Sequence, residues 1–203
     1  MSRPGSFRPA RTLAIALALG LAACTSAPIR YYTLVPPAVD RPAAGASAPF
    51  RFELLPVSIP VQVDQPQLVI RQGGQGVALL GGERWIAPLA DEVRGALSAD
   101  LARELHTQDA SGLPSSGEPR LRIKVDLRRF DSVPGSYALI DAAWSVRALA
   151  GDTTLTCTSQ FREPVGPGYD ALVQGHQQAL AQLAAQIATV AAPLAAGQHA
   201  ACP

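Results

Sequence analysis

The sequence predicts an α+β fold, a two-layer sandwich in which a mainly antiparallel sheet packs against two long helices. Apolar residues recur at helical spacing from Leu89 to Leu105, and again along one stripe from Asp170 to Leu194. Apolar and charged residues alternate strictly over 121–128, which is typical of a strand with one buried face. Together with the other strand-like segments, these patterns predict the order β-β-β-α-β-β-β-α.

The first three strands precede the first helix. Residues 50–57 form the first predicted strand, and residues 67–71 and 75–80 flank a glycine turn as two short strands. Gly81-Gly82 is predicted to end this unit. Pro88 then stands where a helix can begin, because its missing N–H costs nothing in the first turn.

The second half is a three-stranded meander followed by the last helix. Residues 121–128, 137–149 and 153–161 are the predicted strands, with turns at 131–136 and at Gly151-Asp152. The final helix has no charged residue after its first position. It therefore offers one apolar stripe to the sheet and a second face to a neighbour.

The N-terminus has the features of a secretory signal. Three arginines precede an apolar run of about eleven residues that ends in Leu21-Ala22-Ala23-Cys24. Such a run is too short to cross a bilayer of about 30 Å, so residues 1–23 are predicted to be a signal peptide. The last four residues resemble the lipobox of bacterial lipoproteins, which implies that Cys24 is acylated. An ordinary cleaved signal that ends near a cysteine is the alternative.

Residues 24–49 are predicted to be the lipidated N-terminus and a tether, because proline, alanine and serine dominate them. Tyr31-Tyr32 is unlike a linker and is expected to dock as a short strand. The globular domain is predicted over 50–203. Each buried methylene contributes roughly 0.8 kcal/mol, so two or three acyl chains would hold the protein on a membrane. In the lipobox family, Thr25 after the cysteine favours the outer membrane.

Cys157 and Cys202 remain after the signal is removed. The envelope is oxidising, so the two residues are expected to form a disulfide that ties the tail to the sheet. Two free buried thiols are the alternative.

Charge and motifs argue against nucleic-acid binding and against catalysis. Removing the three signal arginines leaves 17 − 3 = 14 basic residues against 16 acidic ones, which is not the charge of a nucleic-acid binder. None of His106, His176 and His199 lies near a serine or cysteine in a pattern typical of a triad. No HExxH or CxxC motif is present, so no metal and no cofactor is expected beyond the acyl groups. A hydrolase with an unrecognised site remains the alternative.

Four short motifs follow one another along the mature chain: Tyr31-Tyr32-Thr33-Leu34; residues 63–71, around Asp64-Gln65-Pro66-Gln67; Arg84-Trp85 followed by Pro88-Leu89; and Arg129-Phe130-Asp131 with Trp144 on the next strand. Behind a lipobox, this ordered set resembles the ABC-transport auxiliary lipoproteins, the PqiC-like group. The pair Cys157 and Cys202 departs from the family pattern.

The resemblance implies a non-enzymatic accessory lipoprotein of an MCE/ABC-type system that carries lipids between two membranes. It implies a lipid anchor at the periplasmic face of the outer membrane and assembly as a homo-oligomer. The expected partners are an MCE-type periplasmic protein and an inner-membrane transporter component. A lipoprotein subunit of a secretion or pilus assembly machine is the alternative.

The contact surface for the partner is expected to include Asp64, Gln67, Arg84 and Trp85. Arg84 stands beside an indole just before a helix start, where it could orient such a surface. The alternative for Trp85 is that it caps the core.

Overall fold

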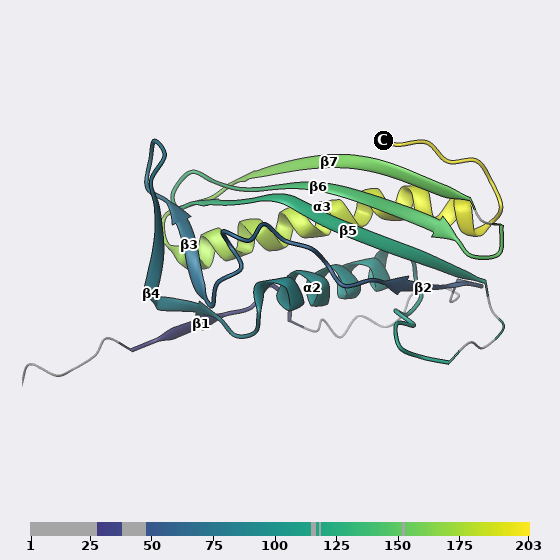
Figure 1. The fold of residues 1–203 in the computed structure, drawn as a ribbon, viewed down its shortest axis with the longest axis horizontal. Coiled ribbons are helices and arrows are strands. Elements are labelled where there is room, and N and C mark those ends of the chain that lie inside the picture. The colour runs from purple at the N-terminus through teal and green to yellow at the C-terminus, as the bar shows by residue number, and fades with distance from the viewer. Residues whose placement is uncertain (1–27, 38–47, 115–116, 118, 152) are drawn as a thin grey trace, which may run out of the picture.

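The computed structural model describes residues 28–37, 48–114, 117, 119–151 and 153–203 (Figure 1). The signal peptide, Cys24 and residues 38–47 of the predicted tether lie outside these ranges. The helices and strands of the described part are, in chain order, β1 (Arg30–Tyr32), β2 (Arg51–Leu54), β3 (Gln67–Arg71), β4 (Val77–Trp85), α2 (Leu89–Glu104), β5 (Arg120–Val133), β6 (Tyr137–Ala148), β7 (Thr154–Pro164) and α3 (Tyr169–Ala195).

The strands form two sheets. One is three-stranded with the order β1-β4-β3, and the other is four-stranded with the order β2-β5-β6-β7. β1 runs parallel to β4 and β2 parallel to β5, while the other pairs are antiparallel. The α+β class is confirmed, and the predicted order follows the short strand expected at the tyrosine pair.

The core lies between the four-stranded sheet and the helices (Figure 1). α3 runs along β5, β6 and β7, and α2 packs beside α3. Leu180, Leu183 and Ile187 of α3 are fully buried. Trp144 of β6 is also buried, and its indole N–H donates a hydrogen bond of 2.8 Å to the Ser159 hydroxyl. The apolar stripe of α3 therefore covers the sheet, as its spacing predicts.

α3 approaches the sheet closely near its N-terminus because Gly175 has no side chain. A Cβ there would lie 2.3 Å from Val165 Cγ1 and 3.1 Å from Ala138 Cβ. By length and composition α3 could cross a membrane, but half of its most apolar window is buried inside the domain. That burial is what the core helix of a globular domain shows.

β4 and β5 both run further than the sequence predicts. β4 continues through Gly81-Gly82 to Trp85, because β1 pairs with its last three residues. β5 continues to Val133 where a turn was predicted from residue 131, because its end pairs with the start of β6. In both cases the partner strand prolongs a strand beyond its local stop signal.

The folded domain begins at β1, before the predicted boundary at residue 50. Tyr32 and Leu34 are core residues, with 8% and 0% of their surface exposed. The carboxylate of Glu92 in α2 is itself buried, and it accepts hydrogen bonds from the Thr33 hydroxyl at 2.7 Å and the Leu34 N–H at 2.8 Å. The tyrosine pair therefore docks as a short strand, as expected, and the segment that follows it is also part of the domain, because a carboxylate of α2 binds it there.

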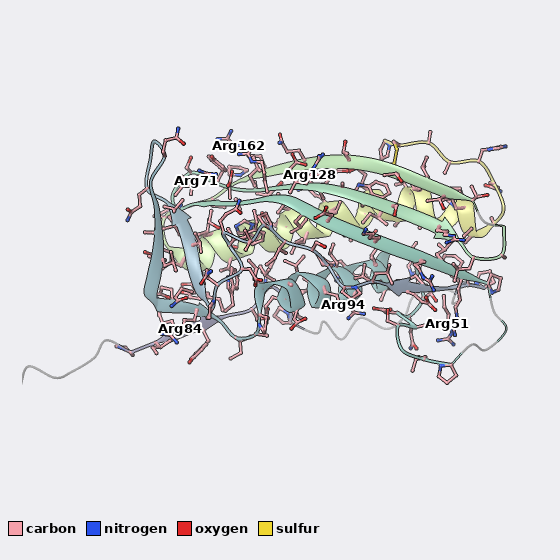
Figure 2. The ribbon with its side chains drawn as sticks, viewed as in Figure 1. Arg51, Arg71, Arg84, Arg94, Arg128 and Arg162 are labelled. Atoms are coloured by element: carbon pink, nitrogen blue, oxygen red, sulfur yellow. A yellow bond between two sulfur atoms is a disulfide. The ribbon has the colours of Figure 1, made fainter. Side chains whose placement is uncertain are left out.

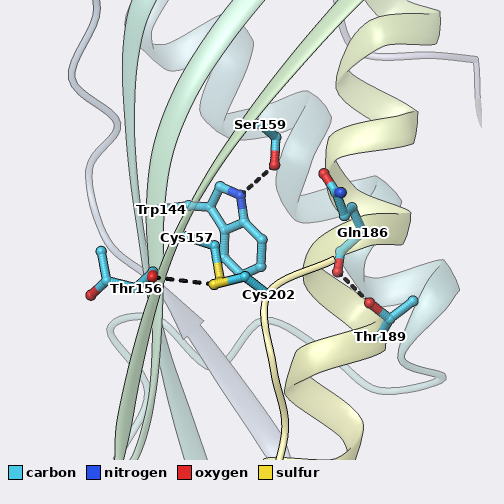
Figure 3. The surroundings of a disulfide bond; sticks show 7 residues. All are labelled: Trp144, Thr156, Cys157, Ser159, Gln186, Thr189 and Cys202. Carbon is cyan, nitrogen blue, oxygen red and sulfur yellow. Dashed lines mark hydrogen bonds between the residues drawn. A yellow bond between two sulfur atoms is a disulfide. The ribbon is translucent and has the colours of Figure 1, made fainter.

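Cys157 of β7 and Cys202 of the C-terminal tail form a disulfide in the structure (Figure 3). Cys157 lies opposite Trp144 in the sheet register. The Cys202 sulfur is 3.3 Å from the Thr156 carbonyl oxygen, but a disulfide sulfur has no proton to donate, so this is a contact and not a hydrogen bond. The bond holds the tail against β7, the edge of the four-stranded sheet.

Candidate functional site

The register of the three-stranded sheet brings a set of exposed and half-buried side chains to one face. Gln67 lies opposite Arg84, and β1 places Tyr31 on the other side of Arg84. Paired residues project from the same side of a sheet. We call this side the outer face; the paired residues that define it are Tyr31, Gln67, Val69, Arg71, Val77, Leu79 and Arg84.

Three large side chains of the outer face are more than half exposed. The exposed fractions are 57% for Tyr31, 56% for Val77 and 52% for Leu79. Figure 1 shows their sheet at one end of the molecule, where β4 stands across the end of the larger sheet. Apolar side chains gathered on an exposed face mark contact surfaces. The outer face is therefore the candidate functional site.

An ion-pair cluster fastens this sheet to the larger one. The carboxylate of Asp131 in β5 forms an ion pair with the guanidinium group of Arg71 in β3, with 2.9 Å between nitrogen and oxygen. The same carboxylate also forms an ion pair with Arg129. Burial opposes ionisation of the carboxyl group, but the two guanidinium groups outweigh it and lower the pKa of Asp131. Arg71, labelled in Figure 2, thus positions the outer face on the rest of the domain.

Three buried polar atoms of β1 and β4 lack hydrogen-bond partners among the described residues. They are the Tyr32 hydroxyl, Glu83 Oε2 and Arg84 Nε. Burial raises the pKa of Tyr32 to about 12, and the nearby Glu83 carboxylate adds to the rise although the two groups do not meet in hydrogen-bond geometry. The Tyr32 hydroxyl is therefore protonated and uncharged throughout the neutral range.

The four residues expected at the contact surface lie in different places in the structure. Gln67 and Arg84 face each other on the outer face, at the end of the molecule where Figure 2 labels Arg84. Asp64 is exposed in the turn that precedes β3. Trp85 is 5% exposed, and its ring meets Phe130 edge-on at 6.2 Å. Trp85 therefore caps the core, which the sequence had left as the alternative, and is not available at the surface.

Sequence reasoning missed the apolar members of the outer face. Val77 and Leu79 project outward, while Ala78 and Leu80 pack against a small buried cluster that includes Ile70 of β3. The signal was a strand-like run that is apolar at every position, whereas a strand with one solvated face alternates. That pattern indicates two apolar faces, of which the structure covers one.

The structure also brings together a serine and a histidine that the sequence did not associate. His176 Nε2 of α3 lies 2.8 Å from the Ser132 Oγ of β5. Both residues are buried, and the imidazole stacks on Phe130 with ring centroids 3.8 Å apart. Burial lowers the pKa of His176 to about 3, so the ring is neutral. No substrate can reach a pair enclosed in this way, and we interpret it as part of the core.

A cavity of about 280 Å³ lies next to the C-terminal tail, at the end of the domain away from the outer face. Phe50, Leu121 and Leu194 are among the residues that line it. It does not include the Ser132–His176 pair. No cluster of three or more histidine, cysteine or acidic side chains suited to a metal ion occurs in the part of the chain that the structure describes.

The domain shares its fold with solved structures. A crystal structure described as an uncharacterized protein superposes with a TM-score of 0.63 at 20% identity, covering 80% of this chain and 97% of that one. A Xanthomonas campestris protein of the family model DUF330 gives a TM-score of 0.56 at 16% identity, covering 79% and 90%. Identities this low establish the fold alone. No curated protein matches the sequence.

The family is established by the sequence itself. The family model of the ABC-type transport auxiliary lipoprotein component matches residues 32–188, from β1 into α3. The chain therefore belongs to this family, and the resemblance found in its ordered motifs is confirmed. The family is one of auxiliary lipoprotein components of transport systems.

Proposed function

We propose that this protein is a lipid-anchored, non-enzymatic accessory subunit of an MCE/ABC-type system that carries lipids between the two membranes of the envelope. Its family membership over residues 32–188 carries the proposal. The lipobox-like segment ending in Cys24 supports acylation, and Thr25 supports the periplasmic face of the outer membrane as the location. The acyl groups would be its only non-protein component.

The proposed role of the domain is to bind an MCE-type periplasmic protein and, through it, an inner-membrane transporter component. The outer face supports this role because it combines exposed apolar side chains, Val77 and Leu79, with the polar pair Gln67 and Arg84. Apolar anchors beside an arginine are typical of contact surfaces between proteins. Asp64 would extend the surface at the start of β3.

Site-specific photo-crosslinking in intact cells tests the proposal. A photoreactive amino acid is placed at Gln67 or Val77, and at Leu113 as a matched exposed position in the loop before β5. We expect the first two positions to give an adduct with a periplasmic MCE-type protein and position 113 to give none. Adducts with secretion or pilus components, or identical adducts from all three positions, would contradict the proposal.

A double variant tests the polar pair. Replacing Gln67 and Arg84 by alanine is expected to reduce recovery of the partner and to make cells sensitive to detergents. Lys124→Ala, an exposed change on β5, is the control and should affect neither.

Light scattering of the purified acylated protein tests the expected homo-oligomer. A monomer at all concentrations would remove that part of the proposal.

A further inference from the structure

The chain between the predicted anchor and the folded domain is short. Arg30, the first residue of β1, comes 30 − 24 = 6 positions after Cys24. An extended chain spans at most about 3.5 Å per residue, so Arg30 lies within about 21 Å of Cys24. α3 alone has 27 residues and a length of about 40 Å. Once Cys24 is acylated, the end of the domain that carries β1 is confined next to the membrane.

Large apolar side chains are exposed at this same end. The exposed fractions are 45% for Ile29, 57% for Tyr31 and 60% for Ile86. Ile86 lies beside β1, because its N–H donates a hydrogen bond of 2.9 Å to the Tyr32 carbonyl. Alternation along β4 and its extension sets Ile86 on the same side as Arg84, which is paired with Tyr31. Arg30 is exposed at the same end of the domain, but it projects from the other side of β1, in register with Glu83.

The chemistry of this set suits the boundary between lipid headgroups and acyl chains. Isoleucine side chains gain free energy when they leave water. A tyrosine ring has an apolar body and a polar tip, which is why tyrosine gathers at membrane interfaces. Arg30, at the same end of the domain but on the other side of β1, has a long side chain that can extend its charged end to the phosphate groups. We call Ile29, Tyr31 and Ile86 the anchor-side patch.

We propose that the anchor-side patch rests in the phospholipid headgroup layer, so that the domain stands on the membrane with β1 against the lipid. The proposal rests on the acylation of Cys24 that the proposed function includes. It leaves Gln67, Val77 and Leu79, which lie away from β1, for the protein partner, and it places Arg84 between the two surfaces. The chain between Cys24 and β1 is then too short to hold the domain away from the membrane.

The test uses the full acylated protein in phospholipid vesicles. With Cys24 acylated and Cys157 bonded to Cys202, the variant Ile86→Cys has one free thiol, which is labelled with an environment-sensitive fluorophore. Leu113→Cys is the matched control, because Leu113 is 55% exposed. Its carbonyl oxygen accepts a hydrogen bond from the guanidinium group of Arg120, the first residue of β5. That end of β5 lies at the opposite end of the domain from β1 (Figure 1). The two probes are compared by iodide quenching from water and by quenching from lipids that carry a nitroxide near the headgroup.

We expect the probe at 86 to be quenched several-fold less by iodide than the probe at 113, and to be quenched by the nitroxide lipids. Adding Ile29→Ser and Tyr31→Ser should restore iodide quenching at 86. The matched change Val61→Ser, at an 81% exposed position outside the patch, should not. Circular dichroism and mass spectrometry of each variant check that folding and acylation are retained.

Equal iodide quenching at both positions, with acylation intact, would overturn the proposal and leave the lipid anchor standing. Shielding of both positions would also overturn it, because the domain would then lie flat on the membrane. Shielding of position 86 that requires an added envelope protein would assign the patch to a protein partner instead. An unacylated Cys24 would remove the proposed function as well, so the two failures are distinguishable.

Discussion

The four-stranded sheet covers its apolar side chains, whereas the three-stranded sheet leaves several of its own in the open. Trp144, Ile123 and Leu183 in and above the larger sheet have 1% or less of their surface exposed. Tyr31 and Val77 of the smaller sheet are 57% and 56% exposed. The larger sheet also carries the disulfide to the tail. We infer from this difference that the four-stranded sheet provides most of the stability and that the three-stranded sheet provides a surface for contacts.

The comparison is tested most strongly by truncating one aromatic residue in each region. Trp144→Ala removes a buried ring and leaves Ser159 without its partner, so we expect a loss of about 3–5 kcal/mol in the free energy of unfolding. Tyr31→Ala removes a mostly exposed ring and should cost about 0.5 kcal/mol or less. Urea denaturation measures both. Similar losses for the two variants would break the division of roles.

Reducing the disulfide between Cys157 of the four-stranded sheet and Cys202 of the tail should lower the free energy of unfolding. The bond closes a loop with a sequence separation of 45, and such loops typically contribute about 2–4 kcal/mol through the unfolded state. We expect a reductant to lower the free energy of unfolding by that amount. A variant with Cys157→Ser and Cys202→Ser should match the reduced protein and ignore the reductant. An unchanged denaturation curve in the reduced wild type would show that the tail adds nothing to stability.

Glu92 should matter most for the smaller region. Glu92→Ala leaves the Leu34 N–H and the Thr33 hydroxyl without their acceptor, and a buried unpaired group costs about 1–3 kcal/mol. We expect faster amide hydrogen exchange over 30–35 and little change in β6. The exposed neighbour Asp91, changed to alanine, is the control. Uniformly faster exchange across both sheets would mean that residues 30–35 do not open independently of the rest of the domain.

Acid should weaken the core through His176. Its pKa is about 3 in the folded protein and about 6.5 when unfolded, so below pH 6.5 the unfolded chain takes up a proton that the folded one does not. Stability therefore falls as the pH falls, by about 1.4 kcal/mol per unit, or about 2 kcal/mol between pH 6.5 and 5. Urea denaturation at both values measures the loss. His176→Gln should flatten this dependence; an equal loss in that variant would assign the effect to other groups.

The sequence predicts the elements whose signals are local. The spacing of leucines in α2 and α3 and the alternation in β5 come from residues close together in the chain, and the structure has all three elements. The end of β4 could not be predicted, because it depends on pairing between Tyr31 and Arg84, far apart in sequence. The docking of Leu34 likewise depends on Glu92, a residue whose charge suggests solvent.

The candidate site was predicted in part for the same reason. Gln67 and Arg84 were chosen as separate motif residues, and the register that makes them neighbours is a property of the fold. Trp85 was assigned to the surface together with Arg84, but adjacent residues of a strand point to opposite faces, so the two could not both be exposed on one face. His176 and Ser132 meet because α3 crosses β5, which no spacing in the chain reveals.

The anchor is the claim on which the other proposals depend. The direct measurement is mass spectrometry of the N-terminal peptide from protein extracted from native envelopes, combined with fractionation of the two membranes. We expect a chain that begins at Cys24, with a diacylglyceryl group on the sulfur and an acyl chain on the amine, in the outer-membrane fraction. An unmodified N-terminus, or a protein found in the soluble fraction, would contradict the account.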